Sequence, residues 1–400
     1  MTTPRLLALA CLAILSLPAN AADSPIAFDW NLRVRHEHVD DELFAREANA
    51  TTVRLRAGLR WRIAPQWEAR LEGEGIVAGG DAYNSGANRR TAYPLVVDAE
   101  GAELNQVSLA WTAPNAGVVA GRQRVALDNQ RWIGSVGWRQ NEQTFDALTA
   151  TLKPGRSVQV TYGWLDRAHR IGGDRAVDPL ARERDLDARI LNASWSRGDH
   201  RLSGYVYAIE DEDVATASTR TLGARYVLAP KAGVRPLGVT AEAARQVDHA
   251  GNPRDFSHSY WLVEPTFALP AATLRVGWEH LGGDGSTALQ TPLATLHAFD
   301  GWTDRFTTTP AAGLEDRYLA ANGQFAKSRT AGALDWTVAW HEYRADAGDA
   351  RYGTEWNASL GVPFGPSWKA LAKVADYRAD GFSRDVTKLW LQIEWSGASR

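Results

Sequence analysis

Four arginines stand at alternating positions of one short stretch, TVRLRAGLRWRI (52–63). They are Arg54, Arg56, Arg60 and Arg62, and the positions between them are apolar or glycine. A helix would distribute these arginines around its circumference, whereas a strand sends alternate side chains to opposite faces. We therefore expect a strand with one apolar face and one cationic face in water. The chemistry on the cationic face is electrostatic, because guanidinium groups attract anions.

The next strand of the same hairpin is expected to supply counter-charges. A turn at 64–66 places facing residues at positions that sum to 130, which gives the pairs Arg62–Glu68, Arg60–Arg70, Gly58–Glu72 and Arg56–Glu74. Directly opposed like charges destabilise a sheet. The Arg60–Arg70 pair therefore predicts a wet environment, with Glu72 nearby or an anion between the two guanidinium groups.

The same parity rule extends the cationic face to other strands. The predicted water-facing cations are Arg33, Arg35, Arg54, Arg56, Arg60, Arg62, Arg70, Arg122, Arg124, Lys373 and Lys388. The formal net charge of the whole chain is −3, so this set is a local concentration of positive charge. One interpretation is a strip that guides anionic solutes. The alternative is that these arginines are ordinary wet residues with no selective role.

The first 21 residues are typical of a cleaved secretory signal. Arg5 provides the positive start, residues 6–17 are apolar, and Ala19-Asn20-Ala21 forms a small-residue cleavage site. Twelve apolar residues are too few for a membrane-spanning helix, which needs about 20. The only Cys and Met of the chain, Cys11 and Met1, lie in this segment. The mature chain, 22–400, therefore has neither a disulfide framework nor a zinc–thiolate site.

Alternating segments of about ten residues recur along the mature chain, which is the length that a tilted strand needs to cross a bilayer. We expect eighteen strands, with sixteen as the alternative, at 27–38, 51–63, 67–79, 104–112, 117–125, 144–153, 157–165, 187–196, 200–209, 219–228, 234–246, 258–268, 272–281, 315–325, 332–343, 352–361, 368–377 and 386–395. Short Pro- and Gly-rich connectors alternate with long ones such as 80–103, 126–143 and 282–314. This pattern predicts an all-β fold: a single closed antiparallel transmembrane barrel with short periplasmic turns and long extracellular loops.

Tryptophan placement supports the barrel. Seven Trp lie beside short connectors or chain ends (Trp30, Trp61, Trp67, Trp111, Trp195, Trp368 and Trp395), and Trp164, Trp278 and Trp340 lie at the opposite strand ends. Two such belts are typical of membrane interfaces. A secreted β-sandwich or β-solenoid would also alternate, but it has no reason to sort its loops by length or to gather Trp at strand ends.

The longest connector, 282–314, is unusually aromatic for a solvated loop. We expect it to fold into the barrel and form a constriction with Phe299, Asp300, Trp302, Asp304 and Arg305. The alternative is a compact extracellular cap.

Catalytic patterns are weak. The sequence has no G-x-S-x-G or H-E-x-x-H motif, and His36 and His38 share the apolar parity without a third ligand. The acidic run EDED (210–213) is expected to be solvated, although its oxygens leave a loop-bound Ca²⁺ as an alternative. We therefore expect no enzyme, no cofactor and no metal centre. The mild net charge gives no reason to expect nucleic acid as a partner.

Two stretches resemble the alginate export family of outer-membrane porins: AGRQRVALDNQRWIGSVGWRQNEQTFDA (120–147) and TPLATLHAFDGWTDRF (291–306). The resemblance implies an eighteen-stranded barrel in the Gram-negative outer membrane with an arginine-rich, anion-selective lumen. It also implies a lumen position for Arg122 and Arg124 of the GRQR motif.

The expected function is a passive channel for anionic solutes such as saccharides, uronates or carboxylates. The expected partners are outer-membrane lipid, an anionic small solute or oligosaccharide, and the barrel assembly machinery during biogenesis. Eighteen strands enclose a wide bore, so a monomer suffices. The alternative is a plugged barrel that binds or adheres through its loops, and an outer-membrane hydrolase is a third, weaker option.

Overall fold

The computed structural model describes residues 24–325 and 332–399, so the predicted signal peptide (1–21) lies outside the described residues. The described chain is built almost entirely of strands. They are β1 (Ile26–Asp41), β2 (Ala48–Ala64), β3 (Trp67–Ala78), β4 (Gly101–Ala113), β5 (Ala116–Gln123), β6 (Thr144–Leu152), β7 (Val158–His169), β8 (Glu183–Arg197), β9 (His200–Asp211), β10 (Thr219–Leu228), β11 (Leu237–Asp248), β12 (Ser257–Ala268), β13 (Ala272–Leu281), β14 (Leu314–Phe325), β15 (Leu334–Arg344), β16 (Arg351–Phe364), β17 (Trp368–Ala379) and β18 (Val386–Ala398).

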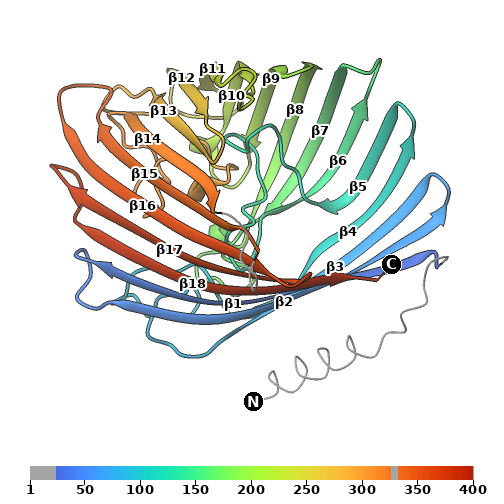
Figure 1. Cartoon of the computed structure of the whole chain (residues 1–400), viewed down its shortest axis with the longest axis horizontal. Coiled ribbons are helices and arrows are strands. Elements are labelled where there is room, and N and C mark those ends of the chain that lie inside the picture. The colour runs from blue at the N-terminus through green and yellow to red at the C-terminus, as the bar shows by residue number, and fades with distance from the viewer. Residues whose placement is uncertain (1–23, 326–331, 400) are drawn as a thin grey trace.

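The strands form one closed antiparallel barrel. Each strand pairs with its neighbours in sequence, and β1 pairs with β18 to close the wall (Figure 1). The prediction of eighteen strands is confirmed, and sixteen is wrong. The β2–β3 register matches the predicted sum of 130, with the facing pairs Arg62–Glu68, Arg60–Arg70, Gly58–Glu72 and Arg56–Glu74.

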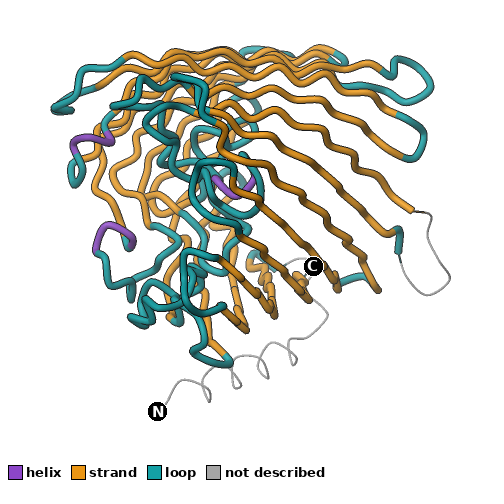
Figure 2. The backbone as a smooth tube through the Cα atoms, turned by 90° about the vertical axis from the view of Figure 1, so that its left-hand side faces the viewer, coloured by secondary structure: helices purple, strands orange, loops and turns teal. Residues whose placement is uncertain are grey.

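The two ends of the barrel differ in the length of their connectors, as the sequence predicted. Two residues join β2 to β3 and β4 to β5 at the short-turn end, whereas 124–143 and 282–313 emerge at the long-loop end. Figure 2 shows that much of the loop backbone turns back into the space that the strands enclose. Three 3₁₀ turns lie in connectors at the long-loop end: η1 (Pro179–Ala181) between β7 and β8, η2 (Ala215–Ala217) between β9 and β10, and η3 (Leu296–Ala298) in the loop 282–313. No helix among the described residues is long and apolar enough to cross a membrane.

The outer face of the wall is apolar and uncovered. Outward residues that are at least one-third exposed include Leu71, Leu109, Leu148, Leu191, Leu222, Val263, Val276, Leu319, Trp356 and Leu391. A continuous apolar band of this kind is unstable in water and is matched by the hydrocarbon of a bilayer. Near the short turns, Trp395 packs against Trp30 and Trp368, with ring centroids 5.6 and 5.9 Å apart.

The hydrophobic core lies inside the barrel at the long-loop end. There Ile133, Leu289, Leu293 and Phe306 of the loops pack against inward wall residues such as Tyr343 and Tyr377. Loop residues are thus buried against strands, and this half of the interior is filled by protein. The fold therefore places its charged loop residues in contact with the charged face of the wall.

Candidate functional site in the barrel interior

Two long loops meet inside the barrel. Ile133 of the loop 124–143 forms an isolated parallel bridge with Leu293 of the loop 282–313. Gly134 N–H donates to the Leu293 carbonyl at 2.8 Å, and Thr295 N–H donates to the Gln130 carbonyl at 3.0 Å. The two loops therefore form one partition across the interior, and backbone hydrogen bonds hold it together.

Arginines of the wall hold the first of these loops. Arg33 donates to the carbonyls of Gly137, Trp138 and Arg139 at 3.1–3.3 Å, and Arg35 donates to the Trp138 carbonyl at 2.5 Å. Arg54 donates to the Gln140 carbonyl at 3.3 Å. Arg35 and Arg54 are at most 1% exposed. These inward arginines therefore have an anchoring role that the sequence did not reveal, because parity gives a side chain's direction but not its partner.

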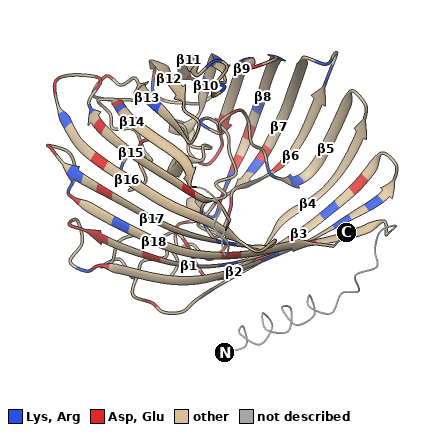
Figure 3. Cartoon of the chain, viewed as in Figure 1, with Lys and Arg blue, Asp and Glu red and all other residues tan. Residues whose placement is uncertain are grey.

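A second group of inward arginines is paired with carboxylates. Arg56 lies 2.7 Å from Glu74 and 3.1 Å from Glu142, and Arg124 contacts both Glu72 and Glu142. Ionic networks of this kind neutralise much of the wall's positive charge. Figure 3 shows acidic and basic positions distributed along the same strands.

The like-charge pair of the β2–β3 hairpin is relieved by a carboxylate from β1. Asp29 contacts Arg70, which also pairs with Glu72, and Asp29 lies 3.8 Å from Arg60. The sequence suggested that Glu72 or a bound anion would offset the repulsion between Arg60 and Arg70. In the structure Glu72 pairs with Arg70, and the carboxylate of Asp29, instead of a bound anion, lies close to both arginines. Arg60 and Arg62 remain exposed near the short-turn end.

The predicted lumen position of Arg122 is wrong. Arg122 faces Val107 of β4 and Asp146 of β6 in the ladder, and Val107 belongs to the exposed outer face. Facing residues of an antiparallel pair project to the same side, so Arg122 points outward. Its guanidinium pairs with Asp146 at 2.9 Å and donates to the Leu104 carbonyl at 3.1 Å. In the strand sequence AGVVAG small or apolar residues occupy both faces, so the sequence did not indicate which face points into the lumen.

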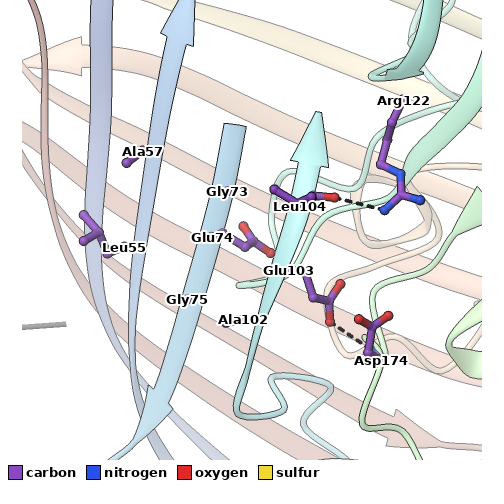
Figure 4. Close-up of a pocket in the computed structure, with 10 residues that line it drawn as sticks. All are labelled: Leu55, Ala57, Gly73, Glu74, Gly75, Ala102, Glu103, Leu104, Arg122 and Asp174. Carbon is purple, nitrogen blue, oxygen red and sulfur yellow. Dashed lines mark hydrogen bonds between the residues drawn. The ribbon is translucent and has the colours of Figure 1, made fainter. Parts of the chain in front are cut away.

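Figure 4 shows Arg122 at the edge of a hollow in the outer wall that also borders Leu55, Gly73 and Leu104. β5 ends at Gln123 and leaves the first residues of β4 without a strand partner on that side. Arg124 lies just beyond this end, where the chain turns inward to Glu72 and Glu142. The two arginines of the GRQR motif therefore lie on opposite sides of the wall.

The loop 282–313 carries two charged clusters. In the first, Asp300 lies 3.0 Å from Arg131, which also lies 2.8 Å from Glu279 on β13. The guanidinium of Arg131 lies 4.7 Å from the ring centre of Phe299. Burial raises the pKa of Asp300, and Arg131 opposes that shift. The cluster fixes residues 299–300 to the wall.

The second cluster is centred on Asp304, which lies 2.8 Å from Arg139, 2.9 Å from Lys388 and 2.7 Å from His297. Burial would raise the pKa of Asp304, but the hydrogen bond from His297 and the charges of Lys388 and Arg139 together hold it well below its ordinary value. Burial lowers the pKa of His297 to about 3. His297 is therefore neutral at physiological pH.

Lys373 of β17 lies among aromatic rings instead of carboxylates. Its Nζ is 2.7 Å from His297 Nε2, 3.7 Å from the ring centre of Trp302 and 4.2 Å from that of Trp138. Cation–π contacts of this kind stabilise a desolvated ammonium. Arg305, the last predicted constriction residue, lies 2.7 Å from Asp41 of β1. The structure thus brings all five predicted loop residues against the wall inside the barrel.

The same loop segment borders two cavities. Leu296, His297 and residues 303–305 line a vestibule cavity of about 400 Å³ at the long-loop end. Residues 298–302 line an inner cavity of about 340 Å³, together with Arg225, Arg275 and His341 of the wall. Each cavity is large enough for a small organic molecule. The segment 296–305 therefore separates the two cavities.

The vestibule cavity combines four cations with an apolar wall. Arg139, Arg170, Arg305 and Lys388 face two carboxylates, Asp41 and Asp304, and the remaining lining includes Val97, Val136, Pro292 and Leu296. Burial lowers the pKa of Arg170, and no ion pair forms at its guanidinium within the described parts of the chain. Sequence analysis missed Arg131, Arg139 and Arg170. The long connectors 126–143 and 166–186 were the available signal, but nothing in them marked a return into the barrel.

Comparisons with known proteins identify the fold. No protein-family model matches the sequence, and no curated protein matches it. The structure is similar to the crystal structure of Pseudomonas aeruginosa OpdK with vanillate, at a TM-score of 0.70 and 14% sequence identity over 93% of this chain and 98% of that chain.

Two Acinetobacter baumannii structures are similar as well. The match to OccAB1 has a TM-score of 0.72 and 13% identity over 95% of this chain and 100% of that chain. The match to OccAB2 has a TM-score of 0.73 and 11% identity over 94% and 98%. At these identities the likeness shows the fold alone, the closed eighteen-stranded antiparallel barrel. It gives no support to a place in the alginate export family.

Proposed function

We propose that the protein is a passive channel of the Gram-negative outer membrane that admits small anionic solutes with an apolar body. Carboxylates are the preferred class, with uronates and short acidic saccharides as the class suggested by the resemblance to alginate exporters. The observation that carries the proposal is the vestibule cavity, in which cations outnumber carboxylates beside an apolar wall. Such a site attracts an anion electrostatically and offers its organic part a dry surface.

The location follows from the outer face of the barrel. Its apolar band requires a bilayer, and closed β-barrels are the strand-based solution for spanning one. Pseudomonas aeruginosa OpdK, with the similar fold, is described as an outer membrane protein. We infer that the short turns lie in the periplasm, that the barrel assembly machinery inserts the chain, and that a monomer suffices.

The direction of the anion path is proposed from the positions of the inward cationic side chains. Arg170 and Lys388 lie in the vestibule cavity, and Arg124, Arg60 and Arg62 follow toward the short-turn end. The inner cavity is less suited to an anion, because Glu264, Glu279, Asp300 and Asp316 line it with only two arginines. We therefore place the path along the β1–β5 side of the interior.

Reversal potentials in planar bilayers with a salt gradient test this proposal. We expect R170Q/K388Q to lose most of the preference for chloride over potassium. R189Q is the matched control, because Arg189 lies on the outer face beside Asp187. Benzoate should block the wild-type current at lower concentration than benzyl alcohol, which has the same ring without the charge. Unchanged reversal potentials together with equal block by both compounds would refute the proposal.

A plugged barrel is the second candidate, and one observation favours it. Leu289, Leu293 and Phe306 are at most 3% exposed, so the loop 282–313 is packed like a protein core. A barrel closed in this way would act through its external loops. Conductance separates the two candidates, since a plugged barrel gives almost no current and a channel gives discrete steps.

A further inference from the structure

Three side chains from three different segments converge at the long-loop rim, outside the lumen. They are His280 of β13, Glu315 of β14 and Asp346 of the loop that follows β15. One ligand atom from each lies within 4.8 Å of the other two. His280 and Glu315 face each other in the ladder and bracket the loop 282–313. Residues before and after the loop 282–313, which we call the partition loop, therefore meet at one point.

The imidazole of His280 is held in place by its neighbours, but one of its two ring nitrogens has no hydrogen-bond partner. Its ring stacks on Trp261 with centroids 5.2 Å apart and planes 7° from parallel, and its Nε2 lies 3.3 Å from Ser259 Oγ. The residue is only 7% exposed, and its buried Nδ1 has no hydrogen-bond partner. This nitrogen points toward Asp346 Oδ1 at 3.6 Å, which is too long for a hydrogen bond.

The carboxylates around this nitrogen are also held in place. Asp346 Oδ2 accepts the Gly283 N–H at 3.0 Å, which leaves Oδ1 facing His280. Glu315 binds Arg317 at 2.8 Å through one oxygen, Oε2. No hydrogen bond fills the space between this nitrogen and the carboxylate oxygen, and a cation there would bind all three groups.

We propose that His280, Glu315 and Asp346 form a binding site for a divalent first-row metal ion of the zinc type. One imidazole nitrogen and two carboxylate oxygens are a ligand set that Zn²⁺ accepts, with a water molecule in the fourth position. Imidazole favours such ions over Mg²⁺ and Ca²⁺, which prefer all-oxygen sites. Tetrahedral zinc needs ligand atoms about 3.4 Å apart, so ligand atoms that lie within 4.8 Å of one another need to approach by at most about 1.4 Å on binding.

The site has a mechanical consequence for the interior. Because its ligands precede and follow the loop 282–313, a bound ion ties both ends of that loop to the next loop of the rim. Asp346 already contacts Gly283, the second residue of the loop, and its backbone N–H donates to the Ala312 carbonyl at 2.9 Å. The ion would add a metal-mediated link to the hydrogen bonds that already join Asp346 to both ends of the loop. This inference does not depend on which solute the barrel passes.

Isothermal titration of the full-length folded barrel in detergent with ZnCl₂, after treatment with a chelator, tests the site. We expect one ion per chain in the wild type and, for H280N and for D346N, binding about 100-fold weaker, since each removes a direct ligand. H38N is the matched control, because His38 lies on β1 with its Nδ1 already bonded to Asn49 at 3.0 Å. Heat-modifiable gel migration checks that each variant is folded.

Co²⁺ provides a second measurement that does not depend on affinity. The Co²⁺-loaded wild type should show visible absorption typical of a low-coordinate nitrogen–oxygen site, and H280N should lose it. Three outcomes would overturn the proposal: no stoichiometric binding, H280N binding as tightly as H38N, or Ca²⁺ displacing Zn²⁺ at equal concentration. The last outcome would indicate a carboxylate site in which the imidazole is no ligand.

Discussion

Lys373 of the wall and His297 of the partition loop form a direct hydrogen bond, with 2.7 Å between Nζ and Nε2. The same imidazole lies 2.7 Å from Asp304 through Nδ1. The network assigns the proton to Nδ1, because the ammonium can only donate. A neutral imidazole therefore links a cation of the wall to a carboxylate of the loop. This link makes the packing of the loop dependent on the protonation of one ring.

Acidification should loosen the partition loop. The pKa of His297 is lowered to about 3 in the packed loop, whereas a released histidine has its ordinary value near 6.5. The released loop binds more protons below pH 6.5, so the packed state loses up to about 1.4 kcal/mol per pH unit between pH 6 and pH 4. Asp304 has a lowered pKa and acts in the same direction, but only below about pH 4.

Hydrogen exchange of the segment 290–306, corrected for the intrinsic pH dependence, measures this effect. Protection should fall from pH 7 to pH 4.5 in the wild type. H297Q keeps one donor and one acceptor but does not titrate, and its protection should change much less. Equal pH dependence in both proteins would show that His297 does not control the loop.

Removal of the partition should open the barrel. We expect a variant lacking residues 290–306 to conduct at least twice as well as the wild type, since these residues separate the two cavities. Single-channel recordings give the result, and heat-modifiable migration shows whether the variant barrel is folded. A folded variant with the wild-type conductance would mean that the barrier lies elsewhere, with the loop 124–143 as the next element to shorten.

The two arginines of the GRQR motif should differ in their effect on ions. R124Q removes a positive charge beside Glu72 and Glu142 in the interior and should shift selectivity toward cations. R122Q removes one from the outer face and should leave the reversal potential unchanged. The pair controls for sequence context, because only one residue separates the two positions. A shift in R122Q as large as that in R124Q would contradict the assigned sides.

The buried anchor Arg35 should matter for stability. R35M removes the donor to the Trp138 carbonyl and leaves the Asp98 carboxylate, 3.7 Å away, without its cation. Removing one partner of a buried pair costs about 3 kcal/mol or more. The midpoint of guanidinium unfolding in lipid vesicles should therefore fall in R35M and stay unchanged in R62Q, where the arginine is exposed. An unchanged midpoint in R35M would show that the loop is held by other contacts.

Local pattern was sufficient for much of the fold. The alternation of Arg54 and Arg56 with Val53 and Leu55 required a strand with two environments, and the turn at 64–66 fixed its register with β3. Both follow from short-range geometry, since side chains alternate and turn length sets pairing. Closure of β1 on β18 follows once every strand has one apolar face and no edge is tolerated in lipid.

The partners of the charged side chains could not be read in this way. β5 shows the limit for direction. Its apolar residues occupy both parities, so only the pairing of Arg122 with Val107 of the outer face places Arg122 outside. The loop 124–143 shows the limit for function, because nothing local indicates that its carbonyls meet Arg33 and Arg35.

The sequence alone determined which side chains alternate, how many strands exist and which connectors are long, because these features depend on neighbours along the chain. Tertiary structure decided which arginines anchor loops, which remain open to solute, and that His280, Glu315 and Asp346 meet at the rim. Those relationships join segments tens to hundreds of residues apart. They exist only once the closed barrel brings the segments to the same place.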